Sequence, residues 1–156
     1  MISNTRKKFA HSHLRSRIEL LFMARAAEHG FSVSKPWGES QAYDVTVESG
    51  GKFLRVQVKS TASTSGYKGY VCSFIQTGTP PYRREQVDFF AIYVIPEDVW
   101  YIIPSEVATR QKYNILLSPR RKKQKYHRYI EAWGLLRCRE KRRVRAAPAR
   151  EARDRA

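Results

Sequence analysis

The sequence predicts one α/β or α+β domain built around a mixed β-sheet. Its 156 residues, of which 42% are hydrophobic and 12% aromatic, are enough for one core and too few for two. The predicted elements follow the order helix, several strands, helix, which places helices against a single sheet. Two neighbouring strands meet at a Gly-Gly turn, the pattern of a β-hairpin. These observations exclude a short peptide and a fully disordered chain.

The first predicted element is a helix over residues 11–29. Its large apolar residues recur with helical spacing at Leu14, Ile18, Leu21 and Phe22. Gly30 follows directly and is the expected C-cap, because glycine adopts the left-handed conformation at little cost. One face of this helix should therefore pack on the sheet.

The segment YDVTVESGGKFLRVQVKS predicts a hairpin whose register can be read directly. If Gly50 and Gly51 form the turn, Ser49 opposes Lys52 and every other pair follows from that one. Val47 then opposes Leu54, Val45 opposes Val56, and Val58 continues the same face. This aliphatic face should pack inward.

The remaining elements are shorter. Strands are predicted at residues 31–33, 69–75, 89–95, 100–103 and 115–117, and helices at residues 105–110 and 125–137. The helix over residues 125–137 would carry an apolar stripe of Tyr129, Ile130, Trp133 and Leu136. No internal repeat is visible.

The other face of the hairpin is polar. Asp44 opposes Gln57 there, and Lys59 lies two residues further on the same face, because side chains of a strand alternate with period 2. An acid, an amide and an ammonium would therefore converge, an arrangement that can hold a metal ion and position a water. The alternative is the exposed polar face of a half-buried hairpin. The presence of Phe53 and Tyr43 on the same face argues against that alternative.

Glu19 on the first helix is a further candidate acid. It lies one step, about 100°, round the helix from Ile18, which places it at the margin of the apolar face. From there its carboxylate could reach a cleft over the sheet. The alternative is a surface glutamate that pairs with Arg15 one helical turn earlier.

Together, the helix ELLFMARAAEHGF, the strands YDVTV and RVQVKS and the later segment DFFAIYVIPEDVWYIIP resemble the PD-(D/E)XK nuclease superfamily. Within it, they resemble the small endonucleases associated with group I introns. The resemblance covers residues 10–135. It implies a restriction-endonuclease-like core, with a central mixed β-sheet flanked by helices, and a phosphodiesterase that depends on Mg²⁺ or Mn²⁺.

The resemblance also implies a role for each candidate residue. Asp44 would be the principal metal ligand and Gln57 would occupy the second acidic position of the motif. Lys59 would orient or activate the attacking water and stabilise the charge that develops on the phosphate. Glu19 would be the auxiliary acid, so the implied metal ligands are Asp44, Gln57 and Glu19. The proline of the motif is missing, and glutamine replaces the second acid, as it does in the intron-associated subgroup.

The charge of the chain predicts a polyanionic partner. Lysine and arginine number 30 against 14 aspartates and glutamates, which gives a formal net charge of +16. Nucleic acid is the first expectation and an anionic membrane surface the competing one. Residues 120–156 alone carry 15 basic and 4 acidic residues. The expected nucleic-acid contacts are Lys68, Arg83, Arg84, Arg120, Arg121, Lys122, Lys123 and Lys125. For these loops and clusters, plain solvent exposure is the alternative.

We therefore predict a metal-dependent DNA endonuclease with homing or intron-associated specificity. Two alternatives stay open: a Holliday-junction or repair nuclease of the same fold, and a non-catalytic, basic nucleic-acid-binding protein. Residues 1–137 would form the nuclease domain and residues 138–156 a basic, disordered tail. A homo-oligomer, a dimer or tetramer, is expected, because one small active centre cuts one strand and symmetry is the simplest route to cutting both.

The cysteines and the hydropathy bear on the compartment. Cys72 and Cys138 are far apart and form no CxxC pair, which fits a reducing compartment and argues against zinc. No stretch reaches the roughly 18 apolar residues that a membrane-spanning helix needs. We expect a cytoplasmic protein that is not inserted in a membrane.

Overall fold

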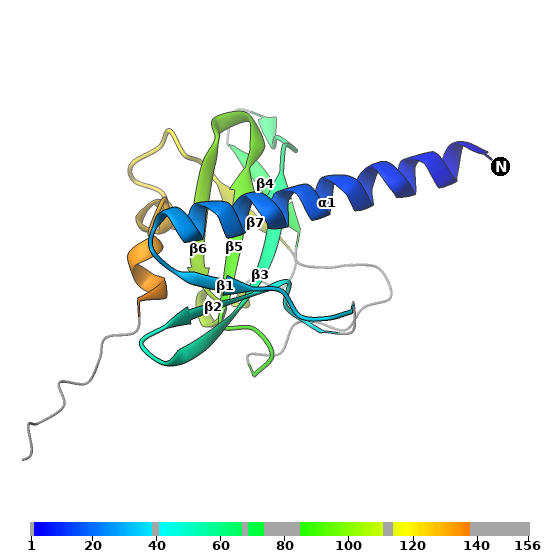
Figure 1. Cartoon of the computed structure of the whole chain (residues 1–156). Coiled ribbons are helices and arrows are strands. Elements are labelled where there is room, and N and C mark those ends of the chain that lie inside the picture. Colours follow the sequence, from blue (N-terminus) through cyan, green and yellow to red (C-terminus); the bar gives the residue numbers. More distant parts are fainter. Residues whose placement is uncertain (1, 39–40, 67–68, 74–84, 111–113, 138–156) are drawn as a thin grey trace, which may run out of the picture.

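The long first helix covers one face of the molecule. In the computed structural model, the described residues are 2–38, 41–66, 69–73, 85–110 and 114–137, with side chains from residue 12 onward. Helix α1 (Ile2–Glu28) begins nine residues before the expected start at residue 11, since no proline or glycine interrupts the sequence there. Its N-terminal part extends beyond the sheet (Figure 1). None of the described helices is sufficiently long and apolar to span a bilayer.

The end of α1 is fixed as predicted. Gly30 has a φ of 81°, its N–H donates to the carbonyl of Ala27 at 2.8 Å, and the N–H of Phe31 donates to Ala26 at 3.1 Å. This pair of bonds is a Schellman motif, which satisfies the last carbonyls of a helix. The chain then turns directly into the first strand.

Five strands form the central sheet. Their order is β1 (Ser32–Ser34), β2 (Val45–Ser49), β3 (Lys52–Thr61), β5 (Phe89–Val94) and β6 (Val99–Pro104). The β3–β5 pair is parallel and the other neighbours are antiparallel, so the predicted mixed sheet is confirmed. Strands β4 (Tyr70–Ser73) and β7 (Asn114–Leu117) form a separate two-stranded sheet, so the prediction of a single sheet is wrong for these two strands.

The central sheet is buried on both faces. On one face, Ile18 and Phe22 of α1 pack against Val45, Val56 and other inward residues of the hairpin. On the other face, the two-stranded sheet and helix α2 (Ser105–Ala108) enclose a second apolar cluster. Figure 1 shows these layers, with α1 across the front of the sheet and β4 and β7 behind it. Double burial explains the unbroken apolar sequence FFAIYV of β5.

The hairpin has the predicted register. Ser49 pairs with Lys52, Val47 with Leu54 and Val45 with Val56, around glycines that both have positive φ. The aliphatic face packs inward, as predicted. Phe53, however, is exposed near the tip of the hairpin, so it was wrong to take this residue as a sign that the polar face is covered.

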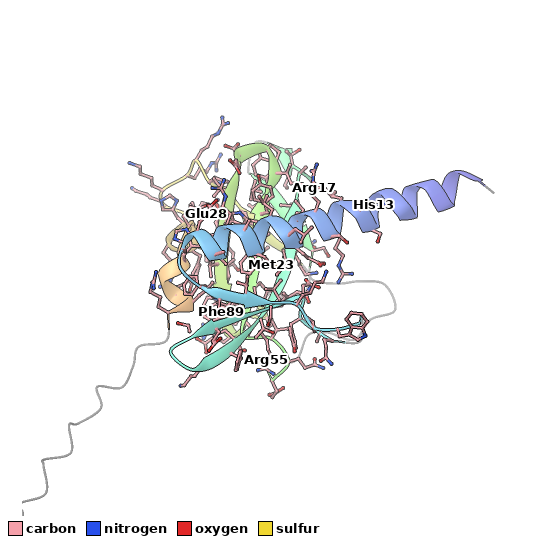
Figure 2. The ribbon with its side chains drawn as sticks, in the orientation of Figure 1. His13, Arg17, Met23, Glu28, Arg55 and Phe89 are labelled. Carbon is pink, nitrogen blue, oxygen red and sulfur yellow. The ribbon has the colours of Figure 1, made fainter. Side chains whose placement is uncertain are left out.

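At one end of the sheet, an ion pair joins β3 to β5. The Nε and Nη2 atoms of Arg55 each lie 3.0 Å from a carboxylate oxygen of Asp88, and the Arg55 N–H donates to the same carboxylate at 2.8 Å. Figure 2 shows Arg55 at this end of the sheet, near Phe89. This bidentate contact fixes the parallel register where β5 begins.

The prediction of a helix over residues 125–137 is wrong. The segment contains two short 3-10 turns, His127–Tyr129 and Trp133–Leu136, separated by Glu131 with a φ of 45°. The Glu131 N–H donates to the carbonyl of Trp100 at 2.8 Å, and the Glu131 carboxylate accepts the N–H of Trp100 at 2.7 Å. The segment therefore pairs with the edge strand β6 instead of coiling into a helix. The other predicted strands and the short helix at Ser105 are confirmed within a few residues.

Candidate active site

Asp44 lies at the entrance to strand β2, where the backbone and a neighbouring side chain hold its carboxylate. The Asp44 N–H donates to the carbonyl of Val56 at 3.0 Å, which continues the hairpin ladder by one residue. One carboxylate oxygen accepts the Val58 N–H at 2.8 Å and also the side-chain amide of Gln57. Both side chains are buried. The predicted juxtaposition of acid and amide is thus present, and the Asp44 carboxylate is fixed in place.

Helix α1 brings Glu19 to the same point. Glu19 is only 5% exposed although it lies at the margin of the apolar helix face. Arg15 connects the two acids, with its Nε 3.2 Å from the Glu19 carboxylate and its Nη2 3.0 Å from that of Asp44. The ammonium of Lys35, just after β1, pairs with the second oxygen of Glu19. The cluster therefore contains two buried carboxylates and two cations from three different segments.

Burial sets the electrostatics of this cluster. It is the largest influence on Asp44 and raises the pKa of that carboxyl above its ordinary value of 3.8. The Val58 N–H and the Arg15 guanidinium lower the pKa, and the nearby Glu19 raises it again. A desolvated carboxylate beside a second one is stabilised by any additional positive charge. The site is therefore suited to a cation.

Two cavities adjoin the cluster and share Arg15. One, of about 330 Å³, is lined by Arg15, Glu19, Lys35 and Asp44 together with smaller polar residues. The other, of about 630 Å³, lies between α1, β3 and β4 and is lined by Arg15, Gln57 and Lys59 among others. Lys59 and Gln57 both line this cavity, together with the residues between and after them on β3, so the predicted convergence of Lys59 with the acid and the amide stays a prediction. Glu19 and Asp44 line the smaller cavity, and that cavity is the route by which solvent and a ligand can approach the carboxylates.

The residues present fit a hard divalent cation. Among the described residues, no group of three or more His, Cys, Asp and Glu side chains is placed to hold a metal ion. The cluster offers two carboxylates and one amide instead, and oxygen donors of these kinds suit Mg²⁺ and Mn²⁺. Two different nitrogens of the Arg15 guanidinium contact the two carboxylates, at 3.2 and 3.0 Å, so both acids already face a shared cation. The side chains able to hold the ion are Glu19, Asp44 and, through its carbonyl oxygen, Gln57.

Most of the chain matches the model of a known protein family. The family model described as PD-(D/E)XK endonuclease matches residues 16–136 of the chain. The protein belongs to this family. As a PD-(D/E)XK endonuclease it is a nuclease, a hydrolase of phosphodiester bonds. The matched region contains all four predicted site residues, Glu19, Asp44, Gln57 and Lys59.

The chain is also similar to solved structures. A bacterial homing endonuclease, I-Ssp6803I, has 29% sequence identity and a TM-score of 0.70, over 78% of this PD-(D/E)XK chain and 89% of its own. The Holliday junction resolvase Hjc of Archaeoglobus fulgidus is more distant, with 17% identity and a TM-score of 0.48 over 65% of this chain and 83% of its own. No curated protein matches the sequence.

Two residues of the candidate site were missed by sequence reasoning. Arg15 was considered only as a helical neighbour of Glu19, and its second contact, to Asp44, depends on how α1 crosses the sheet. Lys35 was not considered at all. No local pattern reports either contact, because each joins segments far apart in the sequence. A basic residue one turn before a candidate acid was the only available signal.

The predicted nucleic-acid contacts are only partly described. Lys68, Arg83 and Arg84 lie outside the described residues. In the second cluster, Arg120 is exposed and forms an ion pair with Glu97 at 3.0 Å. The other members, Arg121, Lys122, Lys123 and Lys125, are also exposed. The predicted basic tail, residues 138–156, lies outside the described residues too.

Proposed function

We propose that this protein is a divalent-metal-dependent DNA endonuclease. The observation that carries the proposal is the convergence of Glu19 from α1 with Asp44 and Gln57 from the hairpin, bridged by Arg15 at 3.2 and 3.0 Å. Burying two carboxylates side by side costs free energy that their ion pairs only partly offset, so their placement together beside a cavity indicates a use for the charge.

Glu19 and Asp44 would hold the metal ion, and the carbonyl oxygen of Gln57 would complete the protein's share of the ligands. Bound Mg²⁺ or Mn²⁺ supplies positive charge to the phosphate oxygens and lowers the pKa of a water. Asp44 is suited to the central position because the Val58 N–H and the Gln57 amide fix its orientation. Glu19 supplies the negative charge that an amide at position 57 lacks.

Lys59 would act on the reacting groups from the larger cavity. Its ammonium would orient the attacking water and stabilise charge on the non-bridging phosphate oxygens. The position on β3, two residues after Gln57, supports this role because both residues line that cavity. The rigidity of a paired strand favours precise placement of such a group.

DNA is the proposed substrate, with homing or intron-associated specificity. The support is the 29% identity to a bacterial homing endonuclease over 78% of the chain, together with the net charge of +16. The exposed cations at residues 120–125 would contact phosphates. A homo-oligomer, a dimer or tetramer, would cut both strands, and the cytoplasm remains the proposed compartment.

Plasmid cleavage tests the site. Supercoiled plasmid with Mg²⁺ should be nicked or linearised by the wild type, while Asp44→Asn and Lys59→Ala should lose roughly 10²–10³-fold in rate, the usual effect of removing one charge-stabilising group. The matched controls Glu106→Gln on α2 and Lys52→Ala at the hairpin turn alter exposed residues and should cut normally. Unchanged cleavage by both site variants would refute the assignment.

A substrate panel tests the specificity. Linear duplex, a four-way junction and single-stranded RNA should be compared at equal concentration with Mg²⁺ and with EDTA. We expect metal-dependent cleavage of duplex DNA. Preferential cutting of the junction would support a resolvase instead. Salt-sensitive binding with no cleavage of any substrate would support the non-catalytic alternative.

A further inference from the structure

The charges in the candidate site balance without any metal. Glu19 and Asp44 contribute two negative charges, and Arg15 and Lys35 contribute two positive ones through direct ion pairs. Each carboxylate has both of its oxygens occupied by donors. A divalent ion at the same carboxylates would bring the cluster to an excess of two positive charges if the cations stayed.

The two sets of charges differ in how firmly they are held. The carboxylates are buried, with side chains 6% and 7% exposed, whereas the side chains of Arg15 and Lys35 are 58% and 47% exposed. Long cationic side chains in contact with solvent can change rotamer at little cost, because water takes over the solvation of their heads. The cations are therefore the mobile partners and the acids the fixed ones.

We propose that Arg15, assisted by Lys35, is an internal placeholder cation that a divalent metal displaces. This inference rests on the proposed function, since it concerns the same metal site. Without metal, the Arg15 guanidinium bridges the two carboxylates and offsets part of their charge. With metal, Arg15 and Lys35 turn into the cavity of about 330 Å³ that they already line. A phosphodiester anion is the natural next partner for the displaced cations, so metal and nucleic acid should bind cooperatively.

Metal binding without nucleic acid tests this proposal. Titration of the full-length protein with Mn²⁺ by calorimetry gives the dissociation constant. Arg15→Gln removes the competing cation and should tighten Mn²⁺ binding by roughly 3- to 10-fold, the value of one or two partly exposed ion pairs. Thermal melts should show Arg15→Gln less stable than the wild type in EDTA and closer to it in saturating Mn²⁺. Arg25→Gln, on the same helix and paired with exposed Glu28, is the matched control.

The Mn²⁺ affinity of Arg15→Gln distinguishes a placeholder role of Arg15 from a purely structural one. Unchanged or weaker Mn²⁺ binding by Arg15→Gln would overturn the placeholder role and indicate that Arg15 only organises the site. If Arg15→Gln does not fold in EDTA, its recovery on refolding with Mn²⁺ supports the proposal, and failure to recover contradicts it. Asp44→Asn tests the proposed metal site separately: undiminished Mn²⁺ binding by that variant would refute the site itself.

Trp37 provides a second, independent observation. It is fully exposed, whereas the other two tryptophans, Trp100 and Trp133, are buried in the core on the α1 side of the sheet. Its neighbours Pro36 and Gly38 line the smaller cavity beside Glu19 and Asp44. Leaving an indole in water forgoes the burial that usually stabilises this side chain, so a surface tryptophan at the rim of a functional cavity indicates a binding contact.

We also infer that Trp37 stacks on a nucleic-acid base next to the candidate active site. The rim of the smaller cavity is complementary to nucleic acid. Lys35 and Arg15 offer cations for the phosphates, and the Trp37 indole offers a flat face for a base. Stacking of this kind suits an unpaired or partly unstacked base at the position where a strand enters the cavity. This inference deepens the proposed function by naming a contact to its substrate.

Fluorescence quenching tests the stacking directly. Since Trp37 is the exposed tryptophan, iodide or acrylamide should quench it in the free protein, and a saturating DNA duplex with a single-stranded overhang should protect it in EDTA. Trp37→Ala should weaken DNA binding by about 5- to 150-fold and Trp37→Phe by much less, because one stacked base contributes roughly 1–3 kcal/mol. Phe53→Ala, which removes another exposed aromatic ring, is the control and should bind normally.

Two results would overturn the proposed contact between Trp37 and a base. Equal DNA affinity of Trp37→Ala and the wild type, or quenching that DNA does not change, would overturn the contact. Protection of Trp37 by rising protein concentration alone would assign this residue to a protein interface instead. Binding in EDTA is independent of cleavage, so failure of this test and failure of the endonuclease assay remain distinct.

Discussion

Gln57 shows how a single side chain sets the balance of the buried cluster. As an amide it donates to Asp44, which a carboxylate at this position could not do. The pairing of Gln57 with Asp44 could be predicted, because strand alternation and one Gly-Gly turn fix it. The contacts of Arg15 and Lys35 could not, because they depend on the crossing of α1 over the sheet and on the path of the chain after β1.

Gln57→Glu should lower the stability of the metal-free protein and raise its affinity for a divalent metal. Without metal, the new carboxylate removes a donor from Asp44 and adds a like charge, which should cost about 1–3 kcal/mol in the free energy of unfolding. With Mn²⁺, the third acid should increase the metal-induced rise in melting temperature relative to the wild type. Chemical denaturation in EDTA and thermal melts with Mn²⁺ measure the two effects. Equal stability in EDTA together with an unchanged metal response would contradict the geometry described for Gln57.

At the level of elements, residues 125–137 show where sequence periodicity misleads. The spacing of Tyr129, Trp133 and Leu136 suggests one helix, but these residues belong to two different cores. Tyr129 packs in the cluster under the two-stranded sheet, whereas Trp133 and Leu136 pack with α1. A single helical stripe cannot face both sides of a sheet. The backbone groups at the free edge of β6 bind Glu131, and this long-range pairing outweighed the local preference of residues 125–137 for a helix.

Glu131 should therefore be a stabilising residue despite its exposed position. Its carboxylate accepts the N–H of Trp100 and the indole N–H of Trp133, both at 2.7 Å. Glu131→Ala leaves these donors without an acceptor and should lower the free energy of unfolding by roughly 1–3 kcal/mol. Glu131→Gln keeps one acceptor oxygen and should lose less, while Glu106→Ala on α2 should lose little. Urea denaturation of the three variants ranks them, and equal stability of Glu131→Ala and the wild type would contradict this anchoring role.

The Arg55–Asp88 ion pair should make stability depend on pH. Partial burial raises the pKa of Asp88, but the Arg55 side chain and N–H outweigh that effect and hold the pKa below 3.8. A carboxyl with a lowered folded-state pKa stabilises the protein above its unfolded pKa and loses that contribution as pH falls through the folded value. Asp88→Asn should thus be less stable than the wild type at pH 7, with the difference vanishing as pH falls below 3.8. Denaturation curves across this range measure it, and a pH-independent difference would argue against the ion pair.

At the scale of the whole molecule, the apolar content of a strand reflects how it is buried but not which strand it pairs with. The unbroken apolar sequence of β5 indicates a strand buried on both faces, and the structure places it between β3 and β6. The parallel pairing of β3 with β5 was not predicted, because it closes a long loop and leaves no mark in either strand. The charge and the candidate site lie in different parts of the chain. The catalytic candidates lie before residue 60, and most of the net charge lies after residue 119.

A chain ending at Arg137 should therefore lose DNA affinity while it keeps cleavage activity. Residues 138–156 contain 8 basic and 3 acidic residues and lie beyond the last core residue described, Leu136. Their removal should change the free energy of unfolding by no more than about 0.5 kcal/mol. It should weaken DNA binding and reduce the slope of log affinity against log salt by about 0.9 for each phosphate that the shortened chain no longer neutralises. Cleavage should persist at low salt, because Glu19, Asp44 and Lys59 remain. An unfolded truncated chain would contradict the domain boundary, and an unchanged salt slope would show that these basic residues do not contact the DNA.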